Sequence, residues 1–169
     1  MSAPQTLRIG TRGSQLARWQ ADHVAGLLRA LPEGPEVEIV IIKTEGDVIV
    51  DVPLSQVGGK AFFTKEIEQA LLDEQVDLAV HSLKDLATDQ PSGLTVGAVL
   101  EREDPRDVLL APEEVGVDEL PGGTRVGTSS LRRRALLARW RPDLELADLR
   151  GNVPTRIRKM REGAYDAIV

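Results

Sequence analysis

The chain has 169 residues, a net charge of −6 and no cysteine, which excludes disulfides, thiolate metal sites and a cysteine nucleophile within it. Aromatic residues make up only 3% of the sequence, so aliphatic side chains must build its cores, and single-stranded nucleic-acid binding by base stacking is disfavoured. The first residues carry no signal peptide and no apolar run is long enough to span a membrane, so we expect a cytoplasmic protein.

Strands and helices are predicted to alternate along the first hundred residues. The apolar pattern predicts strands over 7–10, 37–42, 77–80 and 94–100, and helices over 15–31 and 62–72. The glycine-containing stretch 43–60 is predicted to be largely loop. The polar run 101–107 is interpreted as a crossing between domains, which assigns residues 1–101 to a first domain and 102–169 to a second.

The same alternation continues to the last residue. Strands are predicted over 108–110, 124–127, 144–146 and 165–169, with helices over 131–140 and 154–162. Alternating strands and helices indicate an α/β fold with mainly parallel sheets.

Two pairs of segments resemble each other. GTRGSQLARWQ at 10–20 is similar to GTSSLRRRALLARWR at 127–141, and residues 58–80 are matched more loosely by 150–169. We interpret the repeat as two similar βα halves that present helix N-termini across a cleft. Coincidence is the alternative for so short a match.

Positive charge is concentrated near the end of the chain. Residues 124–161 contain eleven lysines and arginines and three acids, a net of +8, so the remaining residues carry −14. A cationic segment in an acidic protein favours a site for a small polyanion over nucleic-acid or membrane coating.

Arginines in this segment lie at the starts of two predicted helices. A cation there opposes the helix dipole by roughly 0.3–1 kcal/mol, which a bound carboxylate or phosphate would offset. The alternative is that the hydroxyls are ordinary caps and the arginines reach into solvent. Cations nearer the end of the second helix suit the dipole and are interpreted as structural. The candidate anion-binding residues here are Thr128, Ser130, Arg132, Arg133, Arg150 and Arg156.

The first half contains a second set of candidates. Arg12 and Ser14 repeat the pattern of a cation and a hydroxyl at a helix start, and Lys60 follows two glycines without completing a P-loop motif. Asp85 follows Lys84 just after an apolar strand, where open α/β folds bind ligands. An ionised carboxylate there can hold a cationic intermediate or move protons, and a turn-capping aspartate is the equal alternative.

Six segments together resemble the porphobilinogen deaminase, or hydroxymethylbilane synthase, family. They occur in the family's order and spacing over essentially the whole chain. The segments are Arg8–Ser14, Val57–Lys60, Ala79–Asp85, Glu101–Asp107, Val126–Arg133 and Leu149–Asn152.

The resemblance implies an enzyme of tetrapyrrole and haem biosynthesis. Such a transferase joins four porphobilinogen units head to tail, with loss of ammonia at each step, on a dipyrromethane primer held by a thioether to a cysteine. The implied architecture is two domains resembling type II periplasmic binding proteins, with the active site in the cleft between them, and a third domain that carries the cysteine.

The resemblance also implies roles for individual residues. Asp85 would be the catalytic carboxylate, which stabilises a cationic pyrrole nitrogen. The acetate and propionate groups of substrate and cofactor would be bound by Arg12, Ser14, Lys60, Ser82, Lys84, Thr128, Ser130, Arg132, Arg133, Arg150 and Arg156.

The sequence departs from the family pattern in length. It resembles only the first two domains, the second of them truncated, and has no cysteine-bearing third domain. We therefore expect that this chain alone cannot attach the cofactor and is not a competent polymerase. Family members are expected to be monomers, whereas uncovered sheet edges leave self-association open for this chain.

Two other functions are compatible with parts of the pattern. An anion-binding module of the periplasmic type would need the cationic residues but not Asp85. Nucleic-acid binding through the arginines is disfavoured by the −14 remainder and the few aromatic residues. The partners that we expect are porphobilinogen and oligopyrrole polyanions, with no metal.

Overall fold

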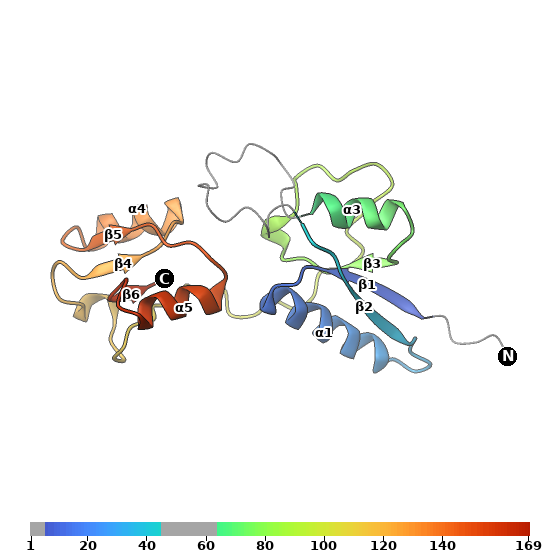
Figure 1. Cartoon of the computed structure of the whole chain (residues 1–169), viewed down its shortest axis with the longest axis horizontal. Coiled ribbons are helices and arrows are strands. Elements are labelled where there is room, and N and C mark those ends of the chain that lie inside the picture. The colour runs from blue at the N-terminus through green and yellow to red at the C-terminus, as the bar shows by residue number, and fades with distance from the viewer. Residues whose placement is uncertain (1–5, 45–63) are drawn as a thin grey trace. The chain divides into compact units, whose positions relative to one another are not determined.

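The computed structural model describes residues 6–44 and 64–169, and the chain divides into two compact units, 1–99 and 100–169. Figure 1 shows a small sheet with accompanying helices in each unit. The predicted domain boundary at 101/102 lies close to this division and stays a prediction. Among the described helices, none combines the length and the apolar character needed to cross a bilayer.

The first unit is built on a parallel three-stranded sheet. Strand β1 is central, with β2 on one side and β3 on the other. Helix α1 packs on β1 and β2, and α3 packs on β1 and β3. The bounds are β1 Leu7–Thr11, α1 Gln15–Arg29, β2 Val37–Ile41, α3 Lys65–Leu72, β3 Leu78–Ala79 and the 3-10 turn η1 Leu83–Asp85.

Small side chains bring α1 close to this sheet. Ile9 of β1 and Ala21 and Ala25 of α1 are fully buried against one another. The Ser14 hydroxyl begins the helix by accepting a hydrogen bond from the Ala17 amide at 3.3 Å. The helix start is thereby fixed directly after β1, at the carboxyl end of the sheet.

The second unit has the same arrangement. Strand β4 is central in a parallel sheet of order β5-β4-β6. Its core includes Val126, Leu137, Leu149 and Ile168. The bounds are the 3-10 turn η2 Val117–Glu119, β4 Arg125–Gly127, α4 Leu131–Trp140, β5 Glu145–Ala147, α5 Val153–Arg161 and β6 Ala167–Ile168.

The predicted duplication is confirmed at the level of topology. In both units the first strand of the repeat is central, and two parallel strands flank it in the same order. An aspartate precedes the last strand in each: Asp77 Oδ2 accepts from the Arg8 amide and Asp166 Oδ2 from the Arg125 amide, both at 2.7 Å. The same local bond thus fixes the register of β3 and of β6.

The shared Leu-Ala-Arg-Trp tetrapeptide, by contrast, is not structurally equivalent. Ser14 caps α1 and Ser130 caps α4, but the tetrapeptide begins two residues after the first cap and seven after the second. Leu16 is accordingly 53% exposed, whereas Leu137 is buried. The matching leucines thus lie on the exposed side of one helix and the buried side of the other, so only the architecture repeats.

Two predicted strands are wrong. No strand forms over 94–100 in the structure, and Val99 is 74% exposed. Over 108–110 only Leu110 pairs, in an isolated antiparallel bridge to Ile168. A strand needs backbone partners for its N–H and C=O groups, and within the described residues the first sheet ends at β3. The apolar pattern alone does not supply a partner.

Candidate functional site

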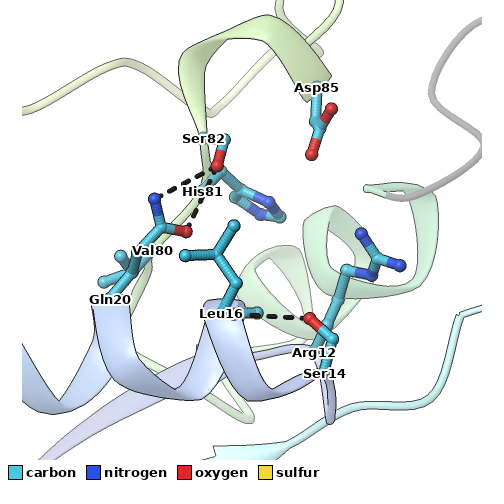
Figure 2. Close-up of a pocket in the computed structure, with 9 residues that line it drawn as sticks. Arg12, Ser14, Leu16, Gln20, Val80, His81, Ser82 and Asp85 are labelled. Atoms are coloured by element: carbon cyan, nitrogen blue, oxygen red, sulfur yellow. Dashed lines mark hydrogen bonds between the residues drawn. The ribbon is translucent and has the colours of Figure 1, made fainter. Parts of the chain in front are cut away.

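A small pocket in the first unit gathers predicted site residues from three places in the chain. Arg12 and Ser14 come from the β1–α1 turn, Ser82 follows β3, and Asp85 ends η1. Figure 2 shows the Asp85 carboxylate and the Arg12 side chain bordering the same opening, with the His81 ring on its other side. The structure therefore brings together a carboxylate, a guanidinium and two hydroxyls at the carboxyl end of the sheet.

Gln20 holds Ser82 in this pocket. The Gln20 amide nitrogen donates to the Ser82 hydroxyl at 3.1 Å, and that hydroxyl donates to the Gln20 amide oxygen, with the oxygens 3.2 Å apart. This reciprocal pair joins α1 to the segment after β3. Sequence reasoning missed Gln20, although its place one turn and a half into the helix capped by Ser14 was available as a signal.

His81 is a further pocket residue that the sequence analysis did not select. Burial lowers the pKa of its imidazole, while the negative charges of Asp85 and Glu68 oppose the shift and the positive charge of Arg12 adds to it. The group is consequently neutral at pH 7. Asp85 is the residue of the pocket's lining that carries a carboxyl group.

Of the two predicted lysines, Lys84 and Lys60, the structure describes only Lys84. Lys84 lies in η1 with an exposed side chain. Lys60 lies outside the described residues, as do residues 45–59 of the predicted loop. Binding of carboxylates by either lysine stays a prediction.

In the second unit, the predicted hydroxyl residues make structural bonds at the start of α4. Ser130 Oγ accepts from the Arg133 amide at 3.4 Å, and Thr128 Oγ1 accepts from the Ser130 amide at 3.4 Å. Thr128 is 1% exposed. The capping interpretation of these residues is therefore correct, and ligand binding by them stays a prediction.

Arg132 and Arg133 share one carboxylate, that of Asp107. Arg132 Nη1 lies 2.9 Å from Asp107 Oδ2, and Arg133 Nη2 lies 2.8 Å from Oδ1. These hydrogen bonds lower the pKa of Asp107 to about 2, so the carboxylate is ionised at neutral pH. Asp107 was part of the family-like motif 101–107 but was not selected as a site residue, because its partners are about 25 residues away.

Within the part of the chain that the structure describes, neither Arg150 nor Arg156 forms an ion pair with a carboxylate. Arg150 Nη1 is buried without a hydrogen-bond partner among the described residues. Arg156 is half-buried, and its Nε–H donates to the Gly151 carbonyl at 2.7 Å. The pKa of its guanidinium is lowered mainly by burial and, to a smaller extent, by the positive charge of Arg133. The buried Nη1 of Arg150 and the half-buried guanidinium of Arg156 are each a donor that would favour an anionic ligand.

One family of sequences matches nearly the whole chain. The sequence model described as porphobilinogen deaminase, dipyromethane cofactor binding domain, matches residues 7–169. The chain belongs to the porphobilinogen deaminase family. This membership does not favour the alternative of a binding module without catalysis.

Several named porphobilinogen deaminases are similar over nearly the whole chain. The one from Syntrophomonas wolfei is 59% identical over 98% of this chain and 54% of its own length. Those from Syntrophobacter fumaroxidans and Nitratidesulfovibrio vulgaris are 54% and 55% identical, over 53% and 52% of their lengths. The chain thus spans about half the length of these relatives.

Among solved structures, the chain is similar to a probable amino-acid ABC transporter extracellular-binding protein from Bacillus subtilis. The identity is 16% and the TM-score 0.43, over 98% of this chain and 70% of the other. This likeness is too low to bear on the fold, which rests on the parallel sheets described above.

The described residues fit the family's dipyrromethane cofactor in their donor chemistry. The buried, unpartnered Nη1 of Arg150 and the half-buried Arg156 are the donors that carboxylate side chains of a pyrrole require. For the family's thioether linkage the sequence supplies no residue, because it contains no cysteine.

Proposed function

We propose that this chain carries the pyrrole-binding and catalytic residues of a hydroxymethylbilane synthase, which joins porphobilinogen units with release of ammonia. The observation that carries the proposal is the family match over residues 7–169. The pocket of Arg12, Ser82 and Asp85 supports it, as does the buried Arg150 Nη1, which has no hydrogen-bond partner among the described residues.

In this proposal the arginines bind and Asp85 acts. Each pyrrole unit carries two carboxylates, so the growing product is a polyanion that guanidinium groups hold in place. Asp85, with its carboxylate in the first unit's pocket, stabilises positive charge at the pyrrole nitrogen of a bound unit. Ser14, Ser82, Thr128 and Ser130 add hydroxyl donors, and Lys60 and Lys84 add charge.

The dipyrromethane cofactor supplies the primer to which the first substrate is joined. We propose that Arg132, Arg133, Arg150 and Arg156 hold its carboxylates. Its thioether requires a cysteine that this sequence does not contain, so we expect no covalent loading of this chain by itself. The proposed setting is the cytoplasm, with porphobilinogen and oligopyrroles as the partners.

Replacing Asp85 tests the catalytic assignment. A fusion in which this chain replaces the matching part of the Syntrophomonas wolfei relative provides a protein of the relatives' length. We expect it to release ammonia from porphobilinogen, and Asp85→Asn to lower the rate by roughly 100-fold or more, because the amide cannot offset positive charge. The 169-residue chain alone is expected to form no hydroxymethylbilane.

Asp89→Asn is the matched control, since Asp89 is an exposed aspartate four residues further along. It should leave the rate unchanged, and circular dichroism should show the same helix content in all variants. Near-normal ammonia release by Asp85→Asn would defeat the assignment.

A further inference from the structure

Asp107 contacts the two arginines at the start of α4 in different ways. Arg133 presents its side edge, with Nε at 3.1 Å and Nη2 at 2.8 Å from the same oxygen, Oδ1. Arg132 presents its end, with Nη1 at 2.9 Å from Oδ2 and Nη2 at 3.2 Å from Oδ1. The carboxylate therefore occupies the outer fork of Arg132 but only the side of Arg133.

The remaining donors of Arg133 can be counted. A guanidinium has five N–H groups, and Arg133 also donates Nη1 to the Val169 carbonyl at 2.9 Å. Counting acceptors among the described residues, three N–H groups are thus used, and one on each Nη remains. The side chain of Arg133 is 28% exposed, compared with 63% for Arg132, so its position is the more restricted of the two.

Electrostatics gives a reason why this position needs support. The charge of Arg133 contributes to the lowered pKa of Arg156, which means that the two guanidinium groups repel each other. The Asp107 carboxylate offsets this repulsion on the Arg133 side. Without that carboxylate, Arg133 would gain solvation and lose repulsion by turning away from Arg156.

We propose that Asp107 is a positioning residue, which holds the Arg133 guanidinium so that its two remaining N–H groups meet a ligand carboxylate together with Arg156. The proposal rests on the proposed function for the identity of the ligand. Asp107 itself does not contact the ligand in this proposal. Arg132 binds the same carboxylate through Nη1 and Nη2 and so helps to hold Asp107 in place.

Three variants of the 169-residue chain test the proposal. Asp107→Ala removes both the charge and the acceptor, whereas Asp107→Asn keeps a neutral acceptor at the Oδ1 position. Asp148→Ala is the matched control, because Asp148 Oδ1 pairs at 3.0 Å with Nη1 of Arg134, another arginine of α4. This substitution removes one negative charge, as Asp107→Ala does. Thermal melting establishes that each variant folds.

The first measurement follows Arg133 directly. In ¹⁵N spectra, the Arg133 Nε–H signal, assigned by its loss in Arg133→Lys, should exchange slowly with water in the wild type and in Asp148→Ala. It should exchange fast in Asp107→Ala. A protected signal in Asp107→Ala would overturn the proposal, because a guanidinium held without Asp107 is not positioned by it.

The second measurement is the affinity for porphobilinogen by calorimetry. We expect the dissociation constant to rise about tenfold in Asp107→Ala and less in Asp107→Asn, as for loss of charge-assisted hydrogen bonds. Asp148→Ala should stay within about twofold of the wild type. Tighter binding by Asp107→Ala, or an equal effect of Asp148→Ala, would mean that Asp107 only competes with the ligand or only adds charge, and would overturn the proposal.

The proposed function and the positioning proposal fail separately. If the wild type binds porphobilinogen no better than Arg133→Ala does, the proposed function is contradicted. The dissociation constants of the same variants are then measured for glutarate, a dicarboxylate without a pyrrole. The expected order of affinities for glutarate is again wild type, Asp107→Asn, Asp107→Ala. Absence of binding for both compounds overturns the positioning proposal as well.

Discussion

Among the described residues, six arginines between 124 and 161 form an ion pair with a carboxylate of their own unit. The six are Arg125, Arg132, Arg133, Arg134, Arg141 and Arg158. Most of these pairs are exposed, where each contributes about 0–1 kcal/mol to stability. They nevertheless decide which cations are available, because within the described residues Arg150 and Arg156 have no carboxylate at ion-pair distance.

The shared carboxylate of Asp107 makes stability depend on pH. Its pKa is lowered to about 2 in the folded chain by the hydrogen bonds from Arg132 and Arg133. A lowered pKa stabilises the fold above the unfolded pKa of about 4, and this contribution is lost as the pH falls from about 4 to about 2. The difference in urea-unfolding free energy between wild type and Asp107→Asn should thus be constant above about pH 5 and shrink by about pH 3. A pH-independent difference would contradict this.

At the scale of elements, α3 and α5 are each followed by a residue with a positive φ angle, but the two residues differ in type. The residue shortly after α3 is Glu74, with φ at 54°, and the corresponding residue after α5 is Gly163, with φ at 81°. Both precede the aspartate that fixes the next strand. Glycine adopts such angles without strain, whereas other residues do so at a cost.

Alanine substitutions at two glycines should therefore have opposite effects. Nothing lies within 4 Å of a Cβ built at Gly163 or at Gly26, which is inside α1. Gly163→Ala should destabilise the second unit by about 1 kcal/mol because of its positive φ, and Gly26→Ala should stabilise the first by about 0.5–1 kcal/mol through helix propensity. Urea unfolding followed by the fluorescence of Trp140 for the second unit and Trp19 for the first measures both. Equal signs would refute the explanation.

At the scale of the whole molecule, the net charge of −6 combines a +8 segment with a −14 remainder. Six arginines of the segment pair with five carboxylates, of which Asp143, Glu145 and Asp148 are already counted in the +8, so only Asp107 and Glu162 add negative charge from outside it. The remaining cationic groups suit a small anion with a few carboxylates. A long phosphate backbone would need a continuous cationic surface.

Nucleic-acid binding is accordingly predicted to be absent under physiological conditions. In a gel-shift assay at about 150 mM salt, the chain should not retard duplex or single-stranded DNA at concentrations up to about 10 μM, because long-range repulsion from the acidic remainder adds to the screening of the arginines. A small basic DNA-binding protein serves as the positive control. A salt-sensitive shift would show that the arginines act as a nucleic-acid surface.

Local patterns along the sequence were sufficient for much of the fold. Alternating strands and helices, serine caps at Ser14 and Ser130 and the duplicated architecture all depend on neighbours within a few residues or on topology that such units favour. The motifs that resemble the porphobilinogen deaminase family, including Ala79–Asp85, are likewise contiguous in sequence, and the family match agrees with them.

The tertiary structure decided the properties that depend on distant partners. The apolar character of 94–100 is a property of the sequence, but a strand forms only where another strand supplies hydrogen bonds, and the described residues supply none there. In the same way, the sequence determined how many arginines lie between 124 and 161. Only folding set Asp107 against Arg132 and Arg133 and buried Arg150 Nη1 with no hydrogen-bond partner among the described residues, because ion pairing acts through space between groups far apart in the chain.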